Sequence, residues 1–501
     1  MRLALYLLPI CFALALPAQN RITLRQADQL KGGRAGEERF DRVIGNVVFV
    51  QNQTTIYCDS ALFYRSANRV EIYGNVRITD GDSVTITALR GEYDGNTRLA
   101  RLRQNVVFTK LETASLYTDF LDFDRQRNEA RYFNGGRLVD SINVLTSRKG
   151  YYDVNTNMAS FKQNVVVKNP DYTMTSDSLQ YNSATKFLYF RTPTTVTDKD
   201  GNKAVYEGGE YNTRLRQSSL VGAMAESASY TVKGDRIVLD DRRRFYRIRG
   251  NVVMTSKEEN LTIFGDESVY DRRNHIGKVY GNAWLAKTTE EGDTLFLAAD
   301  TLVSIDPPEA HRKRLLAYHR VKVWKQDMQG IADSVVYIQA DSSLYFYRSP
   351  VLWTQGNQML ADTIIMQLQK RQVNKVYFTS GSFVVSVDTL GNFNQMKGRT
   401  MTAYFSKGQL DRVVVEGNGE SLFFALDEKT NAFIGMNKII CSNITIRFKN
   451  GVADNVTFYV QPDAEFIPPH ELAKEKTRLK GFVWLSQERP RRQDVVRKKQ
   501  G

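Results

Sequence analysis

The residues with the clearest potential for chemistry are carboxylates that recur about every 30 positions along the 501-residue chain. A row of carboxylates is what a ladder of metal ions or a set of catalytic acids would need. The equivalent positions are Asp59, Leu89, Asp119, Arg148, Asp177, Glu207, Asp235, Asp266, Asp300, Asp333, Asp362, Arg399 and Ser442. Because Leu89 and Arg148 interrupt the series, it does not form a continuous ladder.

The pattern favours a structural role for these carboxylates. General acid–base catalysis needs two carboxylates in different environments that converge on one cleft, and a uniform row has no such place. Calcium-binding rolls carry Asp in Gly-rich nonapeptide repeats, which are absent from this sequence. We therefore expect each Asp to accept backbone N–H bonds at its turn. We expect no catalytic residue, no metal site and no cofactor, and hence no enzyme.

Histidine and cysteine supply no alternative site. The histidines, which do not repeat and lack a Ser or Cys partner in a recognisable motif, are His275, His311, His319 and His470. Cys58 and Cys441 both stand directly before the repeated carboxylate position, where other repeats carry small residues. The two cysteines are therefore expected to be buried fillers rather than a disulfide.

Two further groups of residues have a structural interpretation. Trp284, Trp324 and Trp353 follow the turns of successive repeats and are expected to line the core or a groove. Arg242–Arg244 is expected to be a solvated loop, with phosphate contact as the alternative. No phosphate-binding Gly loop or nucleophile elbow is present in the sequence.

The elements that carry the carboxylates are predicted to be β-strands. Apolar residues stand two and four positions after the carboxylate, as Leu121 and Phe123 do, which is typical of a strand with one buried face. Gly45–Asn46 and Gly74–Asn75 represent a second recurring feature, and both residue types suit tight turns. We predict about four short strands per repeat, joined by polar turns, and no helix between Gln19 and Pro462.

Such a repeat cannot bury an apolar face alone, but stacked copies can. The expected fold class is all-β, an elongated repetitive two-layer sheet or β-solenoid of about 13 repeats of ~30 residues. Its interior is expected to be lined by apolar residues on the strands next to the turns. The candidate lining residues are Val47, Phe49, Phe63, Val76, Ile78, Val106, Phe108, Phe123, Val165, Val167, Val252 and Met254.

The chain is predicted to contain five segments. Residues 1–18 are interpreted as a signal peptide, because a basic start precedes an apolar run and a small residue at a cleavage point; a lipoprotein site at Cys11 is the alternative. The others are a lead-in or N-terminal cap at 19–44, repeats at 45–275, repeats with longer loops at 276–461, and a C-terminal cap and basic tail at 462–501. Within the last, we expect a short helix after Phe466, a strand at Leu479–Trp484 and a disordered end from Arg489.

The net charge of +14 indicates which kind of partner the protein could bind. A basic exported protein suits an anionic partner such as a phosphorylated lipid or a membrane surface. Export argues against nucleic acid. A basic surface that only confers solubility is the alternative.

At the Gly–Asn–Val turn, the Asp59–Tyr64 strand and the repeat period, the chain resembles the OstA-like family over about residues 40–460. This family includes periplasmic lipopolysaccharide-transport bridge proteins and the N-terminal domain of the outer-membrane lipopolysaccharide-assembly protein. The resemblance implies a twisted two-layer β-jellyroll that is open along one side and holds lipid acyl chains in its apolar interior. It also implies edge-to-edge β-sheet stacking with other Lpt-type envelope proteins.

The leading hypothesis is therefore a non-enzymatic periplasmic carrier that binds lipopolysaccharide through the candidate lining residues and bridges toward the outer membrane. The basic tail is expected to contact anionic headgroups or a partner at either membrane. The chain departs from the family in having more repeats than a typical bridge protein and no barrel pattern after them. A secreted β-helix enzyme acting on polysaccharide and a closed-core envelope scaffold are the alternatives.

Overall fold

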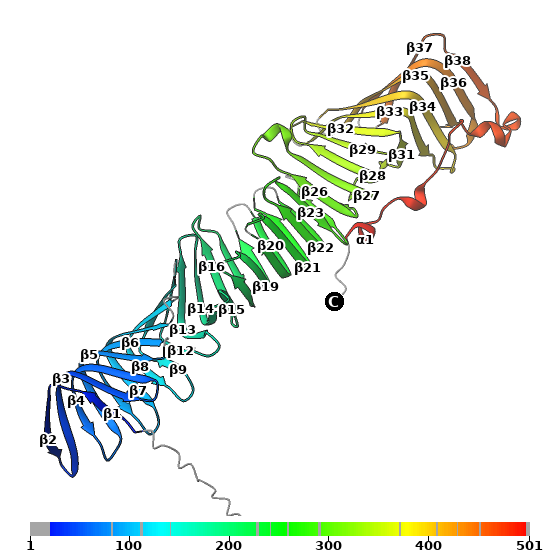
Figure 1. The fold of residues 1–501 in the computed structure, drawn as a ribbon. Coiled ribbons are helices and arrows are strands. Elements are labelled where there is room, and N and C mark those ends of the chain that lie inside the picture. The colour runs from blue at the N-terminus through cyan, green and yellow to red at the C-terminus, as the bar shows by residue number, and fades with distance from the viewer. Residues whose placement is uncertain are drawn as a thin grey trace, which may run out of the picture. The chain divides into compact units, whose positions relative to one another are not determined.

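The computed structural model describes residues 21–496, apart from residues 82–83, 111–113, 141, 227–229, 241, 258–259, 289–291, 370–371, 407–408, 428 and 450–451. The predicted signal peptide, Cys11 and the last five residues of the predicted basic tail lie outside the described residues. The chain divides into two compact units. Figure 1 colours their strands in chain order from blue to red. Unit 1 holds the described residues up to 201 and residues 212–214, and unit 2 holds residues 202–211 and the rest. The predicted boundary between residues 275 and 276 stays a prediction.

Unit 1 is built from antiparallel strands, and the predicted N-terminal cap at 19–44 contributes the first of them. The strands are β1 (Thr23–Gln26), β2 (Gln29–Ala35), β3 (Glu38–Gln51), β4 (Thr54–Tyr64), β5 (Arg69–Asp80), β6 (Val84–Asp94), β7 (Leu99–Lys110), β8 (Ala114–Asp124), β9 (Glu129–Tyr132), β10 (Gly136–Asp140), β11 (Asn143–Ser147), β12 (Lys149–Asp153), β13 (Met158–Asn169), β14 (Tyr172–Asn182), β15 (Phe187–Phe190) and β16 (Thr194–Asp198). The all-β fold class is confirmed.

Most long strands of unit 1 pass through both layers of the fold. β4 pairs with β5 in two blocks that are separated by a bulge, and the same interruption recurs between β3 and β4, β5 and β6, and β6 and β7. We call the layer that contains Ser60–Tyr64 layer A and the layer that contains Thr54–Tyr57 layer B. Phe49 of layer B and Phe63 of layer A pack with ring centroids 5.2 Å apart, so the two layers face each other across an apolar interior.

The bulges form the corner at which each strand changes layer. At Gly74–Asn75 both residues have positive φ, of 74° and 40°, and the Asn75 Nδ2 donates a hydrogen bond of 2.9 Å to Asp59 on the neighbouring strand. The prediction of four short strands joined by turns is therefore wrong where the Gly–Asn pair lies within one bent strand. Positive φ suits a strand bulge as well as a turn, so the local pattern did not separate them.

The repeated carboxylates lie at these corners, but most of their bonds differ from the predicted ones. Asp59, Asp235 and Asp266 each accept a hydrogen bond from an Asn side chain 16 positions later, whereas a backbone donor was expected. Asp300 and Asp333 instead accept hydrogen bonds from Arg320 and Arg348. Asp28, which precedes the series, forms the same kind of pair with Asn46. Asp119 does accept the backbone N–H of Asn105, at 3.1 Å. The carboxylates thus stabilise corners, as the structural interpretation proposed.

Replacing a corner glycine is expected to destabilise its unit. Gly281 has φ of +69°, and a Cβ added there would lie 2.8 Å from the Asp266 carboxylate. Gly281→Ala should lower the free energy of unfolding of unit 2 by about 2–3 kcal/mol, of which roughly 1–2 is the cost of positive φ and about 1 the disturbed Asp266–Asn282 bond. Gly356→Ala is the control in urea denaturation, because Gly356 has φ of +80° and no atom within 4 Å of an added Cβ. Equal losses in the two variants would contradict a specific contact with Asp266.

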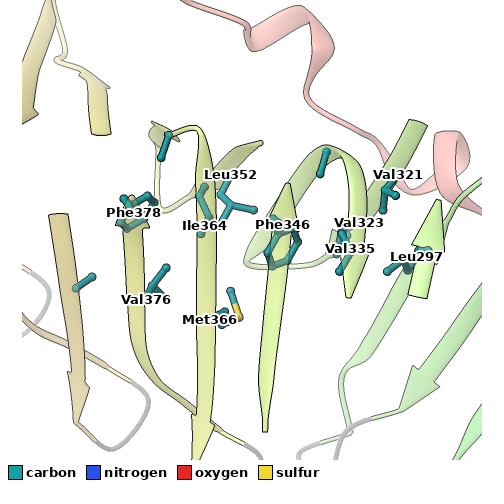
Figure 2. Packing of buried hydrophobic residues seen from close by; sticks show 14 of the residues in the cluster. Leu297, Val321, Val323, Val335, Phe346, Leu352, Ile364, Met366, Val376 and Phe378 are labelled. Carbon is teal, nitrogen blue, oxygen red and sulfur yellow. The ribbon is translucent and has the colours of Figure 1, made fainter. Parts of the chain in front are cut away.

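Unit 2 continues the same architecture. Its strands are β17 (Lys203–Tyr206), β18 (Gly208–Asn212), β19 (Gln217–Glu226), β20 (Tyr230–Asp240), β21 (Phe245–Ser256), β22 (Leu261–Asp271), β23 (Ile276–Tyr280), β24 (Trp284–Thr288), β25 (Thr294–Ala298), β26 (Thr301–Ile305), β27 (Arg314–Lys325), β28 (Met328–Ile338), β29 (Ser343–Tyr347), β30 (Val351–Thr354), β31 (Asn357–Leu360), β32 (Thr363–Gln369), β33 (Gln372–Val387), β34 (Phe393–Ser406), β35 (Gln409–Leu426), β36 (Phe433–Lys449), β37 (Val452–Tyr459) and β38 (Asp463–Ile467). In unit 2, layer A is the layer that contains Ile364 and layer B the layer that contains Val323. These two residues belong to one buried cluster between the layers (Figure 2).

In the described part of unit 2, short helical turns occur in one loop between strands and after the last strand. They are η1 (Ala310–Arg312), η2 (Pro469–Glu471), η3 (Lys474–Thr477), η4 (Ser486–Glu488) and α1 (Arg492–Val495). The expected short helix after Phe466 is present as η2. The strand expected at Leu479–Trp484 is absent, and the end expected to be disordered from Arg489 is ordered up to residue 496. Their contacts, described below, explain both differences.

Candidate functional site

The continuous interior of unit 1 is the first candidate for a functional site. Phe108 of layer B packs against Phe123 and Tyr152 of layer A, with ring centroids 6.0 Å and 5.7 Å apart. Val47 and Phe49 are 1% and 0% exposed. Because the side chains from the two layers meet in this way, the interior presents hydrocarbon and aromatic surface and could accommodate apolar groups if the layers separated.

The predicted lining residues lie in this interior or in its counterpart in unit 2. Ten of the twelve belong to unit 1 and are buried: Val47, Phe49, Phe63, Val76, Ile78, Val106, Phe108, Phe123, Val165 and Val167. In unit 2, Val252 is buried, and Met254 is half-buried and packs against the interior cluster. Their contact with lipid stays a prediction.

The free edges of the two layers of unit 1 meet along a series of polar contacts, which we call the polar seam. Gln51 at the end of β3 donates 2.8 Å to the Gly95 carbonyl and accepts 2.6 Å from the Tyr93 hydroxyl. One repeat later, Asp80 at the end of β5 forms an ion pair of 2.5 Å with Arg125. These contacts join the layer B end of one strand to a residue about 45 positions ahead in layer A.

The seam continues along unit 1. Lys110 at the end of β7 contacts the Val154 carbonyl and donates 2.6 Å to the Asn157 side chain. Asp140 at the end of β10 lies 3.0 Å from the Lys186 ammonium. The seam thus has one side-chain contact group per repeat, in contrast to the backbone ladder that holds each layer.

Burial shapes the protonation of the seam. It raises the pKa of Tyr93 to about 12 and lowers the pKa of Lys110 below its ordinary value. Burial and the hydrogen-bonded Asp140 carboxylate together raise the pKa of Tyr181. Both tyrosines are therefore neutral hydrogen-bond donors at physiological pH.

Sequence reasoning did not identify the seam, although a signal was present. Along β3 and β5 the inward-facing positions are apolar until the last, which is Gln51 in one strand and Asp80 in the other. The same alternation ends in Lys110 in β7 and in Asp140 in β10. A polar residue that recurs at the inward end of each strand would have predicted a polar boundary of the interior.

The other residues considered from the sequence form no such site. Cys58 and Cys441 are both free and buried, as expected, and burial raises the pKa of the Cys58 thiol to about 12. In the described residues, no group of three or more His, Cys, Asp or Glu side chains could hold a metal ion. Trp284 and Trp324 pack in an apolar core cluster with Val495, which is one of the two expected placements, and this cluster is separate from the cluster between the layers.

The ends of the array expose strand edges. β2 is hydrogen bonded to β3, and β37 to β36; no other partner of β2 or β37 occurs among the described strands. Unpaired strand edges are templates for pairing with another sheet. A helix with the length and apolar character needed to cross a bilayer was not found in the described ranges.

Comparisons with known proteins found two matching families and matching solved structures. Residues 19–177 match the model of a family described as OstA-like protein, and residues 144–276 match a family described as LptA/(LptD N-terminal domain) LPS transport protein. Among curated proteins none matches the chain. One matching solved structure is LptH from Pseudomonas aeruginosa, described as the LptA homologous periplasmic component of the lipopolysaccharide transport device. It is 17% identical, with a TM-score of 0.21, and the match covers 24% of this chain and 82% of that one.

The two family matches overlap at residues 144–177 and together span residues 19–276, which hold the corners and the polar seam of unit 1. The all-β, two-layer repeat is the architecture that the resemblance implied. Over residues 19–276, the chain therefore belongs to the OstA-like family of lipopolysaccharide-transport proteins.

Proposed function

We propose that the chain is a non-enzymatic periplasmic carrier whose interior shields the acyl chains of lipopolysaccharide. The observation that carries this proposal is the asymmetry of unit 1. Its interior is apolar along the layers, and the contacts that close its mouth among the described residues are the side-chain bonds of the polar seam. Side-chain bonds of this kind are worth about 0.5–3 kcal/mol each, so parting them costs far less than breaking a backbone ladder.

Charge and strand edges support the remaining parts of the proposal. A net charge of +14 favours an anionic amphiphile such as lipopolysaccharide over a neutral lipid. The exposed edges of β2 and β37 suit stacking onto the sheets of other Lpt-type proteins, which would extend the apolar interior toward the outer membrane.

Site-specific photo-crosslinking in cells tests the proposal. A photoreactive amino acid at Phe49, Phe108, Phe123 or Val167 should capture lipopolysaccharide, because these side chains point into the interior. Tyr117 is the control position, since it lies on the same sheet but is 39% exposed on the outer face. Capture at Tyr117 without capture at the inward positions would exclude the carrier.

A closed-core scaffold is the second candidate function, and one observation favours it. The interior is filled by side chains, for example Phe49 and Leu121, both 0% exposed. A scaffold would purify without lipid, and no inward crosslinker position would capture lipopolysaccharide. Mass spectrometry of lipids that co-purify with the native protein separates the two functions.

A further inference from the structure

The residues after β38 form a segment that returns across unit 2, and we call residues 468–496 the C-terminal strap (Figure 1). The strap meets the strands of layer B in reverse order. Leu479 bonds to Gln395 of β34, Leu485 to Gln358 of β31 and Arg489 to Gln329 of β28. Helix α1 then packs on β25 and β27. The strap therefore crosses the strands instead of pairing with one of them.

The strap covers the outer face of layer B, not the interior. Adjacent residues of a strand point to opposite faces. In β27, Val323 belongs to the interior cluster, whereas Trp324 lies in the cluster with Val495 of the strap. In β33, Val384 packs on the interior cluster, whereas Phe383 packs in the cluster with Leu479 of the strap.

Where the strap covers it, this outer face is strongly apolar. Beneath the strap it carries large side chains such as Trp324 and Phe424. On layer B of unit 1, the outward residues of β5 include Arg77, which is exposed, and Thr79. A sheet face packed on one side is normally polar on the other, so the apolar outer face of unit 2 indicates a surface built to bind something.

Two buried glutamines on this face form hydrogen bonds with the backbone of the strap. Gln358, 0% exposed, donates 2.7 Å to the Val483 carbonyl and accepts 2.7 Å from the Leu485 N–H. Gln395, 2% exposed, makes the same pair of bonds with the Thr477 carbonyl and the Leu479 N–H, at 2.9 Å and 2.8 Å. Each side-chain amide thus replaces the peptide groups of a neighbouring strand, which recognises an extended segment with little regard to its sequence.

A third glutamine and a few side chains complete the recognition. Gln329, 4% exposed, accepts a bond of 2.7 Å from Arg489. On the strap, Phe482 and Trp484 point inward onto Phe393, with ring centroids 5.3 Å and 5.2 Å away, while Val483 between them is 46% exposed. The sequence requirement is therefore confined to a small number of anchors.

The strap does not satisfy every group on this face. Trp353 stands opposite Gln358 in the β30–β31 pair and is 2% exposed, yet its indole nitrogen has no hydrogen-bond partner. Among the described residues, the strap forms no strand ladder with the rest of unit 2, and side-chain hydrogen bonds attach it. An element attached by side-chain contacts can open locally without breaking the ladders of the strands that it crosses.

From these observations, we propose that the outer face of layer B in unit 2 is a binding site for an extended polypeptide, and that the strap is its resident, releasable occupant. Because the strap is covalently attached, its high effective concentration keeps other segments out until it is released. This site lies on the opposite face of layer B from the interior. The proposal for it does not depend on the proposal that the interior binds lipid.

The test uses the full chain with a protease site inserted between Leu472 and Ala473, cut after folding. A labelled synthetic peptide of residues 473–496 then competes with the cut strap. We expect the strap to co-elute with the chain after cutting and to exchange with the peptide. Gln358→Met should weaken peptide binding about tenfold, and a second change, Gln395→Met, about 100-fold in total, because each removes two hydrogen bonds.

Matched controls keep the result interpretable. Gln409→Met, at an exposed residue of β35, should leave peptide affinity unchanged. A peptide that carries Phe482→Ser and Trp484→Ser should compete at least about tenfold less well, and this change cannot disturb the folding of the chain. The proposal is overturned if the cut strap exchanges only when unit 2 unfolds, since it would then be an integral third layer. It is also overturned if the glutamine variants or the altered peptide bind as tightly as the originals.

Discussion

Asp140→Ala is expected to lower the local stability of unit 1 by about 3–5 kcal/mol, toward the lower value. Asp140 is 3% exposed and accepts bonds from both the Lys186 ammonium and the Tyr181 hydroxyl. Its removal leaves a cation and a buried hydroxyl without their partner. The Lys186 side chain retains 25% exposure, so water partly compensates its charge. Native-state hydrogen exchange of the amides in β10 and β14 would report the loss.

Asp122→Ala is the matched control for this prediction. Asp122 also pairs with a cation, Arg103, but it is 29% exposed, and Arg103 keeps bonds to two backbone carbonyls. An exposed ion pair contributes about 0–1 kcal/mol. A loss at Asp140 no larger than that at Asp122 would show that the seam does not hold the layers together.

Phe49→Ala is expected to cost about 3–5 kcal/mol of unfolding free energy, as large-to-small changes in a packed core do. Phe49 is 0% exposed and packs edge-on against Phe63 across the two layers, so its removal leaves a cavity in the interior of unit 1. The change should appear in urea denaturation as an earlier transition of unit 1 and in faster exchange of the β3 and β4 amides.

Phe133→Ala is the corresponding surface change in the same unit. Phe133 is 37% exposed and lies beside Phe120 and Arg103. Phe133→Ala should lower the free energy of unfolding by no more than about 1 kcal/mol, because this partly exposed side chain removes little apolar area from water on folding. If the two variants lose similar stability, the interior of unit 1 would be loosely packed, and the layers would already be partly separated.

Local periodicity was sufficient to predict the layers of the fold. Apolar alternation around Val47 and Phe49 placed these residues on the inner face, because a strand has only two faces and one of them is buried. The position of Cys58 among small residues likewise predicted a buried free thiol. Such features depend on residues that are neighbours along the chain, which is why they can be read from it.

Features that depend on distant residues were not predictable in the same way. The partner of Asp59 is Asn75 on the next strand, and the corner they share exists only once the strands are paired. Alternation along the strand restricted Trp324 to one of two faces. It did not show that a segment more than 150 residues later covers the outer face. The bond from Arg489 to Gln329 shows this cover. The basic composition around Arg489 suggested disorder, and a few apolar anchors outweighed it.

The spacing of the polar seam has a consequence for the size of any guest. Strands lie about 4.8 Å apart, and each repeat adds two strands to a layer, so successive seam contacts are separated by roughly 10 Å. The polar seam of unit 1 therefore closes the interior at separate contacts. Inserting a molecule requires breaking only the seam contacts along the length that it occupies. The free-energy cost of insertion therefore rises with the length of the guest and not with the length of the protein.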